Sequence, residues 1–166
     1  LGQGVVGLLT TALLAETALS ELVTFDGYER RRELSNAFGA DRSLEPERGV
    51  PESFEDVTGA RADLTYELSG NPAALDDAIA TTGFDGRVVV GSWYGTEPAT
   101  LELGGRFHRD RIDVRSSQVS TIDPRLSGRW SRERRHEVTW EWLRRLDLSA
   151  LFTHEFALED AAEAYE

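Results

Sequence analysis

The residues with the clearest chemical potential are three glycines near the start of the chain, Gly2, Gly4 and Gly7, spaced as G-x-G-x-x-G. They lead into the apolar segment 8–15, which predicts a helix. The first glycine permits a tight turn, the second lets backbone approach a phosphate, and the third lets the helix pack closely on a sheet. The helix N-terminus adds free N–H groups and a positive dipole end. The spacing predicts a pyrophosphate-binding turn, although glycine-rich turns into helices are common without a ligand.

A carboxylate follows this motif at a characteristic distance. Asp26 stands nineteen residues after Gly7 and closes the β-prone run 21–25. A carboxylate there can accept both hydroxyls of an adenosine ribose and repels a 2′-phosphate, which favours NAD over NADP. Two alternatives stay open: Asp26 is a turn residue before glycine, or the arginines at 30–32 hold a 2′-phosphate and NADP binds instead.

The segments that must position these residues alternate between strand and helix. A continuous β-branched run at 88–90 is typical of a strand covered on both faces, as in parallel sheets. The alternation predicts an α/β fold with a doubly wound, Rossmann-like parallel sheet. The predicted strands are 21–25, 43–44, 62–68 and 88–90, and the predicted helices are 5–15, 28–38, 52–57 and a segment opening at 71–72.

The start of the chain conflicts with a complete fold of this kind. A buried strand normally runs into the first glycine of such a motif, yet only Leu1 precedes Gly2. We therefore expect a sheet that lacks its first strand by truncation. On this interpretation residues 1–166 form one dinucleotide-binding domain that is incomplete at both ends.

The remainder of the chain is less regular. Strands are predicted at 100–103, 112–115 and 152–156, and helices at 131–146 and from 158 onward. Val138, Trp142 and Leu146 fall on one face of the long helix, which predicts that Trp142 lies in the core. Trp140 faces elsewhere and is available to another subunit or domain.

Composition restricts the partners. The net charge of −12 argues against nucleic acid and anionic membranes. The absence of long apolar runs argues against a membrane-spanning or signal segment, and the absence of cysteine points to the cytoplasm. All eighteen basic residues are arginine, against thirty acidic residues. This indicates a halophilic, high-salt setting or, equally well, a GC-rich genome.

Five motifs in order resemble one known family. They are the glycine motif at 2–7, Asp26, the F-G-A-D segment 38–41, the E-L-S-G-N segment 67–71 and the V-V-V-G segment 88–91. The T-H stretch at 153–154 and the L-E-D-A stretch at 158–161 add to the resemblance. In this order the chain resembles the cofactor domain of the medium-chain, zinc-type alcohol and polyol dehydrogenases. The resemblance covers nearly the whole chain.

The resemblance implies roles for individual residues. Backbone N–H groups of the glycine turn would hold the pyrophosphate, and Asp26 and Arg31 would contact the adenosine ribose. Residues 68–70 would line the cofactor between adenosine and nicotinamide, and residues 90–92 and 114–117 would meet the nicotinamide side. For Ser69 and Ser92 plain loop polarity is an equal alternative, and Arg115 would pair with a phosphate or with a surface carboxylate. The implied cofactor-binding residues are Gly2, Gly4, Val5, Val6, Gly7, Asp26, Arg31, Leu68, Ser69, Gly70, Val90, Gly91, Ser92, Val114, Arg115 and Ser116.

The same resemblance implies that the catalytic half lies elsewhere. The family transfers hydride between an alcohol and NAD, and it uses a zinc ion held by Cys, His and Glu-type ligands in a separate N-terminal domain. His108, His136 and His154 lack metal-ligand spacing and are expected at the surface or in packing. We expect no catalytic residue and no metal in this chain, and a homo-oligomer for the full-length protein. The alternatives are an S-adenosylmethionine-dependent methyltransferase and a non-catalytic nucleotide-binding module.

Overall fold

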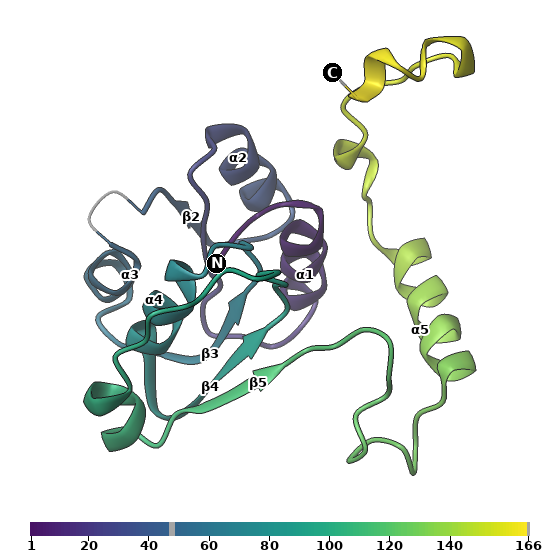
Figure 1. The fold of residues 1–166 in the computed structure, drawn as a ribbon. Coiled ribbons are helices and arrows are strands. Elements are labelled where there is room, and N and C mark those ends of the chain that lie inside the picture. The colour runs from purple at the N-terminus through teal and green to yellow at the C-terminus, as the bar shows by residue number, and fades with distance from the viewer. Residues whose placement is uncertain (47–48, 166) are drawn as a thin grey trace.

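Helices and strands alternate through the first ninety residues, as the sequence predicts. The structure is a computed structural model that describes residues 1–46 and 49–165. In the first half the elements are α1 (Val5–Ala15), β1 (Val23–Phe25), α2 (Glu29–Ala37), β2 (Arg42–Leu44), α3 (Val50–Thr58), β3 (Ala62–Glu67), α4 (Ala73–Thr81) and β4 (Thr82–Val90). Then come η1 (Leu103–Phe107), β5 (Asp113–Ser116), α5 (Arg132–Arg145) and the short turns η2 (Ser149–Leu151), η3 (Leu158–Asp160) and η4 (Glu163–Tyr165). Figure 1 shows α1 to α4 gathered around the strands.

The strands form two parallel sheets. β1 pairs with β2, and β4 lies between β3 and β5 with Val89 opposite both Tyr66 and Arg115. Parallel neighbours joined through helices confirm the α/β class and its parallel pairing. Most of the predicted cofactor-binding residues outside the glycine turn lie at or after the carboxyl ends of β1, β3 and β4.

Leu1 and Gly2 lie between the two sheets. The Leu1 amine donates to the Tyr66 carbonyl at 2.6 Å, and the Leu1 carbonyl accepts the Leu68 N–H at 2.9 Å. On the other side, the Gly2 N–H donates to the Phe25 carbonyl at 2.9 Å. These two residues therefore make one step of a parallel ladder that joins β3 to β1.

A cavity continues from this step along the same gap. Its volume is about 380 Å³, and it is lined by β1, β3, α1 and α3, with Val23 and Thr65 among its walls. The spatial order β2, β1, gap, β3, β4, β5 is the doubly wound order with its first strand left out. This agrees with the sheet predicted from the glycine motif.

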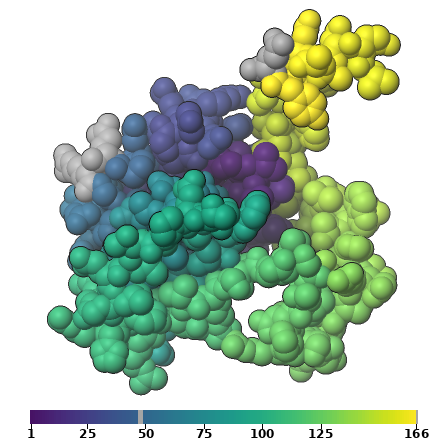
Figure 2. All heavy atoms as spheres, viewed as in Figure 1, coloured from purple at the N-terminus to yellow at the C-terminus, as the bar shows by residue number. Residues whose placement is uncertain are grey.

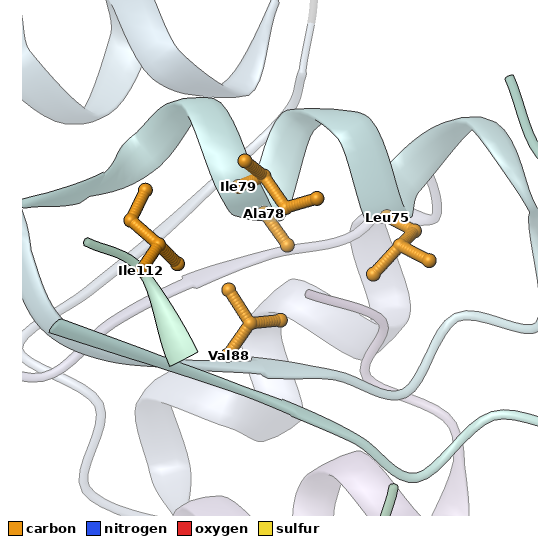
Figure 3. Packing of buried hydrophobic residues seen from close by; sticks show 5 residues of the cluster. All are labelled: Leu75, Ala78, Ile79, Val88 and Ile112. Atoms are coloured by element: carbon orange, nitrogen blue, oxygen red, sulfur yellow. The ribbon is translucent and has the colours of Figure 1, made fainter. Parts of the chain in front are cut away.

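Two hydrophobic clusters flank the strands. Leu75, Ala78 and Ile79 of α4 point toward Val88 and Ile112, as Figure 3 shows. A second cluster joins α1 and α2 through Leu8, Ala12, Leu34 and Phe38. Val88 is fully buried while Val89 and Val90 are half-buried, so the β-branched run is less completely covered than its composition predicts.

Two predicted strands are wrong. Residues 100–102 have no regular structure, because the Glu102 N–H donates to the Asp76 carboxylate at 2.8 Å, and η1 comes directly after them. Residues 152–156 have no regular structure, and Phe152 is 80% exposed, so no sheet edge covers its ring. The helix predicted from 158 is present only as the single turns η3 and η4.

The placement of Trp142 in the core is also wrong. Helix α5 forms as predicted, with the Ser131 hydroxyl accepting the Arg134 N–H as its N-cap, yet none of its residues is buried. Trp142 is half-buried, and the Arg145 guanidinium lies 4.4 Å from its ring centroid. Figure 1 shows α5 standing away from the strands, so its apolar face has no second layer to pack on.

None of the helices in the described part of the chain is long and apolar enough to cross a membrane.

Candidate functional site at the carboxyl ends of the strands

The glycine turn has the shape that its spacing predicts. Gly2 has a φ of +83°, and a Cβ there would lie 2.5 Å from the Ser69 Cα. A Cβ on Gly7 would lie 1.9 Å from the Gly2 carbonyl oxygen. Both positions exclude a larger residue, whereas a Cβ on Gly4 would meet nothing within 4 Å. The second glycine thus faces open space, where an incoming group can approach the N-terminus of α1.

Asp26 is joined directly to this turn. One carboxylate oxygen, Oδ2, accepts the Gln3 N–H at 2.7 Å, and the other, Oδ1, accepts the Tyr28 N–H at 2.8 Å. The bond from the Tyr28 N–H is typical of a turn residue, one of the two alternatives for Asp26. The bond from the Gln3 N–H joins the end of β1 to the glycine turn. Each oxygen has a further lone pair for a hydroxyl donor.

The three arginines that come after Asp26 separate in space. The Arg31 Nη1 lies 3.6 Å from Asp26 Oδ2, and its guanidinium lies 4.6 Å from the centroid of the Tyr28 ring. Arg30 instead pairs with Glu33 on the surface, and Arg32 pairs with Glu45 while donating to the Asp26 carbonyl. Arg31 is therefore the one of the three placed beside the carboxylate.

The loops after β3 and β4 are bonded to each other. The Gly70 N–H donates to Ser92 Oγ at 2.9 Å, and the Gly91 N–H donates to the Glu67 carbonyl at 2.9 Å. A Cβ on Gly91 would lie 2.5 Å from Leu68 Cδ2, so this close approach also requires glycine. The hydroxyl groups of both Ser69 and Ser92 therefore form hydrogen bonds within the protein: Ser92 Oγ accepts the Gly70 N–H, and Ser69 Oγ accepts the Asn71 N–H at 3.0 Å.

The end of β5 continues the same edge. Ser116 pairs with Val90, and the Ser117 N–H donates to the Val90 carbonyl at 2.7 Å. Arg115 Nε lies 2.7 Å from Asp113 Oδ2. Of the two partners considered for Arg115, a phosphate or a carboxylate, the structure places a carboxylate beside it. Val114 precedes it and is 37% exposed. The site residues thus share one edge, but Arg115 is engaged along its own strand.

Two residues without a role in the sequence analysis lie inside this site. Glu67, in the E-L-S-G-N segment, has a fully buried side chain whose carboxylate accepts the Tyr94 hydroxyl. Burial, together with this bond, raises the pKa of Tyr94, so its hydroxyl remains a donor. The position of Glu67 beside a predicted strand end was a usable signal, but its pairing with Tyr94 depends on how two loops meet.

The described residues do not provide a zinc site. Within 1–46 and 49–165, no three His, Asp or Glu side chains gather closely enough to hold a metal ion. His154 instead shares a hydrogen bond with Thr153 at 2.9 Å and stacks on Phe156.

Comparison with known proteins decides the family. The family model described as zinc-binding dehydrogenase matches residues 5–133. The chain belongs to this family. Sorbitol dehydrogenase 1 of Saccharomyces cerevisiae is 26% identical over 99% of this chain and 45% of its own length. L-threonine 3-dehydrogenase of Bacillus subtilis is 25% identical over 100% of this chain and 46% of its own.

Solved structures show the same fold. An alcohol dehydrogenase of Escherichia coli complexed with NADH superposes with a TM-score of 0.81 at 20% identity, over 99% of this chain and 45% of that one. The chain spans less than half the length of these two relatives. The family assignment supports the dehydrogenase interpretation over the methyltransferase alternative.

Proposed function

We propose that this chain is the NAD-binding half of a zinc-type alcohol or polyol dehydrogenase. The observation that carries the proposal is the direct bonding of the selected segments at one edge of the strands. Asp26 bonds the glycine turn, that turn abuts Ser69, and the loop of Ser69 bonds Ser92. A dinucleotide is long enough to require all of these segments at once.

The geometry of the turn fits the cofactor. The open space at Gly4 and the first N–H groups of α1 suit a pyrophosphate, since Val5 and Val6 are more than half exposed. Asp26 suits the adenosine ribose with Arg31 beside it, and its negative charge favours NAD, with NADP as the second candidate. Leu68, Ser69 and Gly70 then line the cofactor between adenosine and nicotinamide. The residues proposed for the nicotinamide side are Val90, Gly91, Ser92, Val114, Arg115 and Ser116.

The chemistry of the whole protein follows from its family. NAD supplies the hydride acceptor when it is bound, and an alcohol or carbonyl compound is the substrate. The residues of this chain bind and orient the cofactor. No described cluster fits zinc, so we assign zinc and the catalytic groups to a part of the protein outside this chain.

The cellular setting is proposed from composition. We place the protein in the cytoplasm because the chain has no cysteine, and we propose a homo-oligomer for the full-length protein. The net charge of −12 argues against nucleic acid and anionic membranes as partners. The acidic excess and the lack of lysine have a GC-rich genome as one explanation and halophilic adaptation, which we propose, as the other. Molar KCl would then raise the free energy of unfolding, and a decrease would contradict the halophilic interpretation.

Calorimetric titration with NAD⁺ and NADP⁺ tests the cofactor assignment. Asp26→Asn removes the charge while keeping the shape, and we expect NAD⁺ to bind about tenfold more weakly, with a smaller preference over NADP⁺. Asp41→Asn is the matched control, because Asp41 also accepts a backbone N–H at 2.7 Å, from Leu22, away from the ribose position. Equal effects of the two substitutions, or no NAD⁺ binding by the unmodified chain, would contradict the proposal.

A further inference from the structure

The binding of a dinucleotide leaves one buried charged group without a role. Glu67 ends β3, and its side chain is 0% exposed. Its carboxylate accepts the Ser69 N–H at 2.7 Å, the Ser69 hydroxyl and the Tyr94 hydroxyl. A buried carboxylate is strongly destabilising without such donors, so these contacts hold their partners firmly in place.

The donors come from two different loops. Ser69 belongs to the loop 68–72 after β3, and Tyr94 belongs to the loop 91–95 after β4. The starts of the two loops are already joined through Gly91 and Ser92. Tyr94 lies further along the loop after β4, and its hydrogen bond to Glu67 joins this more distant part of the loop to the end of β3.

The loop 68–72 also packs directly against the glycine turn. Gly2 lies so close to Ser69 that a Cβ would approach its backbone nitrogen to 2.6 Å. A displacement of Ser69 therefore moves the turn at which the pyrophosphate is proposed to bind. Tyr94 is itself held, because its ring packs on the cluster of α4 and β4.

We propose that Tyr94 is a positioning residue. Through the buried carboxylate of Glu67, it keeps the loops 68–72 and 91–95 in the relative position that the nicotinamide side of the dinucleotide requires. The inference rests on the proposed NAD-binding function and adds a specific residue to it. It also separates the site into two halves, since Asp26 serves the adenosine side without contact to Tyr94.

Titration of the 166-residue chain with NAD⁺ and with AMP tests this separation. In Tyr94→Phe we expect NAD⁺ affinity to fall about tenfold, as for loss of a hydrogen bond to a buried charged group, and AMP affinity to stay within about twofold. Tyr66→Phe is the matched control, since it also removes a tyrosine hydroxyl. Tyr66 directly precedes Glu67 in the chain but lines the cavity between β1 and β3. The control should bind both ligands as the unmodified chain does.

A double variant tests whether Tyr94 acts through Glu67. Adding Tyr94→Phe to Glu67→Leu should weaken NAD⁺ binding no further than Glu67→Leu alone, because leucine offers the Tyr94 hydroxyl no acceptor and both changes then remove the same contact. Independent, multiplying losses would overturn the proposed route. So would unchanged NAD⁺ affinity in Tyr94→Phe, or equal losses for NAD⁺ and AMP.

Hydrogen exchange of the unmodified chain gives a test that does not depend on a variant folding. NAD⁺, unlike AMP, should slow amide exchange in 68–72 and in 91–95 together. Slowing in one loop alone would overturn the proposal. If the unmodified chain binds neither ligand, the NAD-binding function itself fails, whereas NAD⁺ binding that ignores Tyr94 overturns the positioning role alone.

Discussion

Residues 1–116 and 117–165 carry similar apolar patterns but reach different degrees of burial. In the first region α4 buries Leu75, Ala78 and Ile79 against β4. In the second, α5 has an apolar face of comparable spacing, yet none of the described residues from 117 to 165 is buried. Figure 2 shows this segment extending along one side of the body and beyond it.

The difference shows that an apolar stripe predicts a helix but not its burial. A helix gains stability from an apolar face only where a second layer covers that face. The strands supply that layer for α4. Near α5, by contrast, the apolar packing on the body comes from Leu146, Leu148 and Leu151 just after the helix, which contact the cluster of α1 and α2. We infer that the first region carries most of the folding free energy.

The largest expected effect contrasts the two helices directly. Ile79→Ala removes a side chain that is 3% exposed and should lower the free energy of unfolding by about 2–5 kcal/mol. Val138→Ala makes a similar change on the half-buried face of α5 and should cost about 0.5 kcal/mol or less. Urea denaturation of both variants measures the contrast. Similar losses would show that α5 is packed in solution.

A glycine from each region sharpens the comparison further. Gly2→Ala combines a φ of +83° with a clash against Ser69, and it should cost about 1–3 kcal/mol and weaken NAD⁺ binding. Gly128→Ala places a Cβ where nothing lies within 4 Å and should change stability by about 0.5 kcal/mol at most. Denaturation and NAD⁺ titration of both variants test this. A neutral Gly2→Ala would contradict the close approach of the glycine turn to Ser69.

The smallest effect is expected within α5. Arg145→Ala removes a guanidinium that lies over the Trp142 ring and is 62% exposed, and it should cost about 0.5 kcal/mol. Tryptophan fluorescence during denaturation should report a slightly earlier transition. A loss above that of Ile79→Ala would reverse the ranking of the two regions.

Much of the first region could be predicted because local rules and packing agree there. The glycine spacing, Asp26 at the end of β1 and the β-branched run of β4 predicted parallel strands with a site at their carboxyl ends, and the fold confirms the strands. The roles of the individual site residues stay predictions. The segments 100–103 and 152–156 were misjudged as strands because a strand needs a partner edge as well as a β-prone sequence.

The sequence by itself determined the alternation of helices and strands through the first ninety residues and the family that the motifs resemble, because these depend on local spacing of residue types. Tertiary structure alone decided three further features. It placed Leu1 as a single step between two sheets, left the face of α5 uncovered, and joined the Glu67 carboxylate to Tyr94 from the next loop. Each of these features depends on which segments distant in the chain meet in space, so no local pattern encodes it.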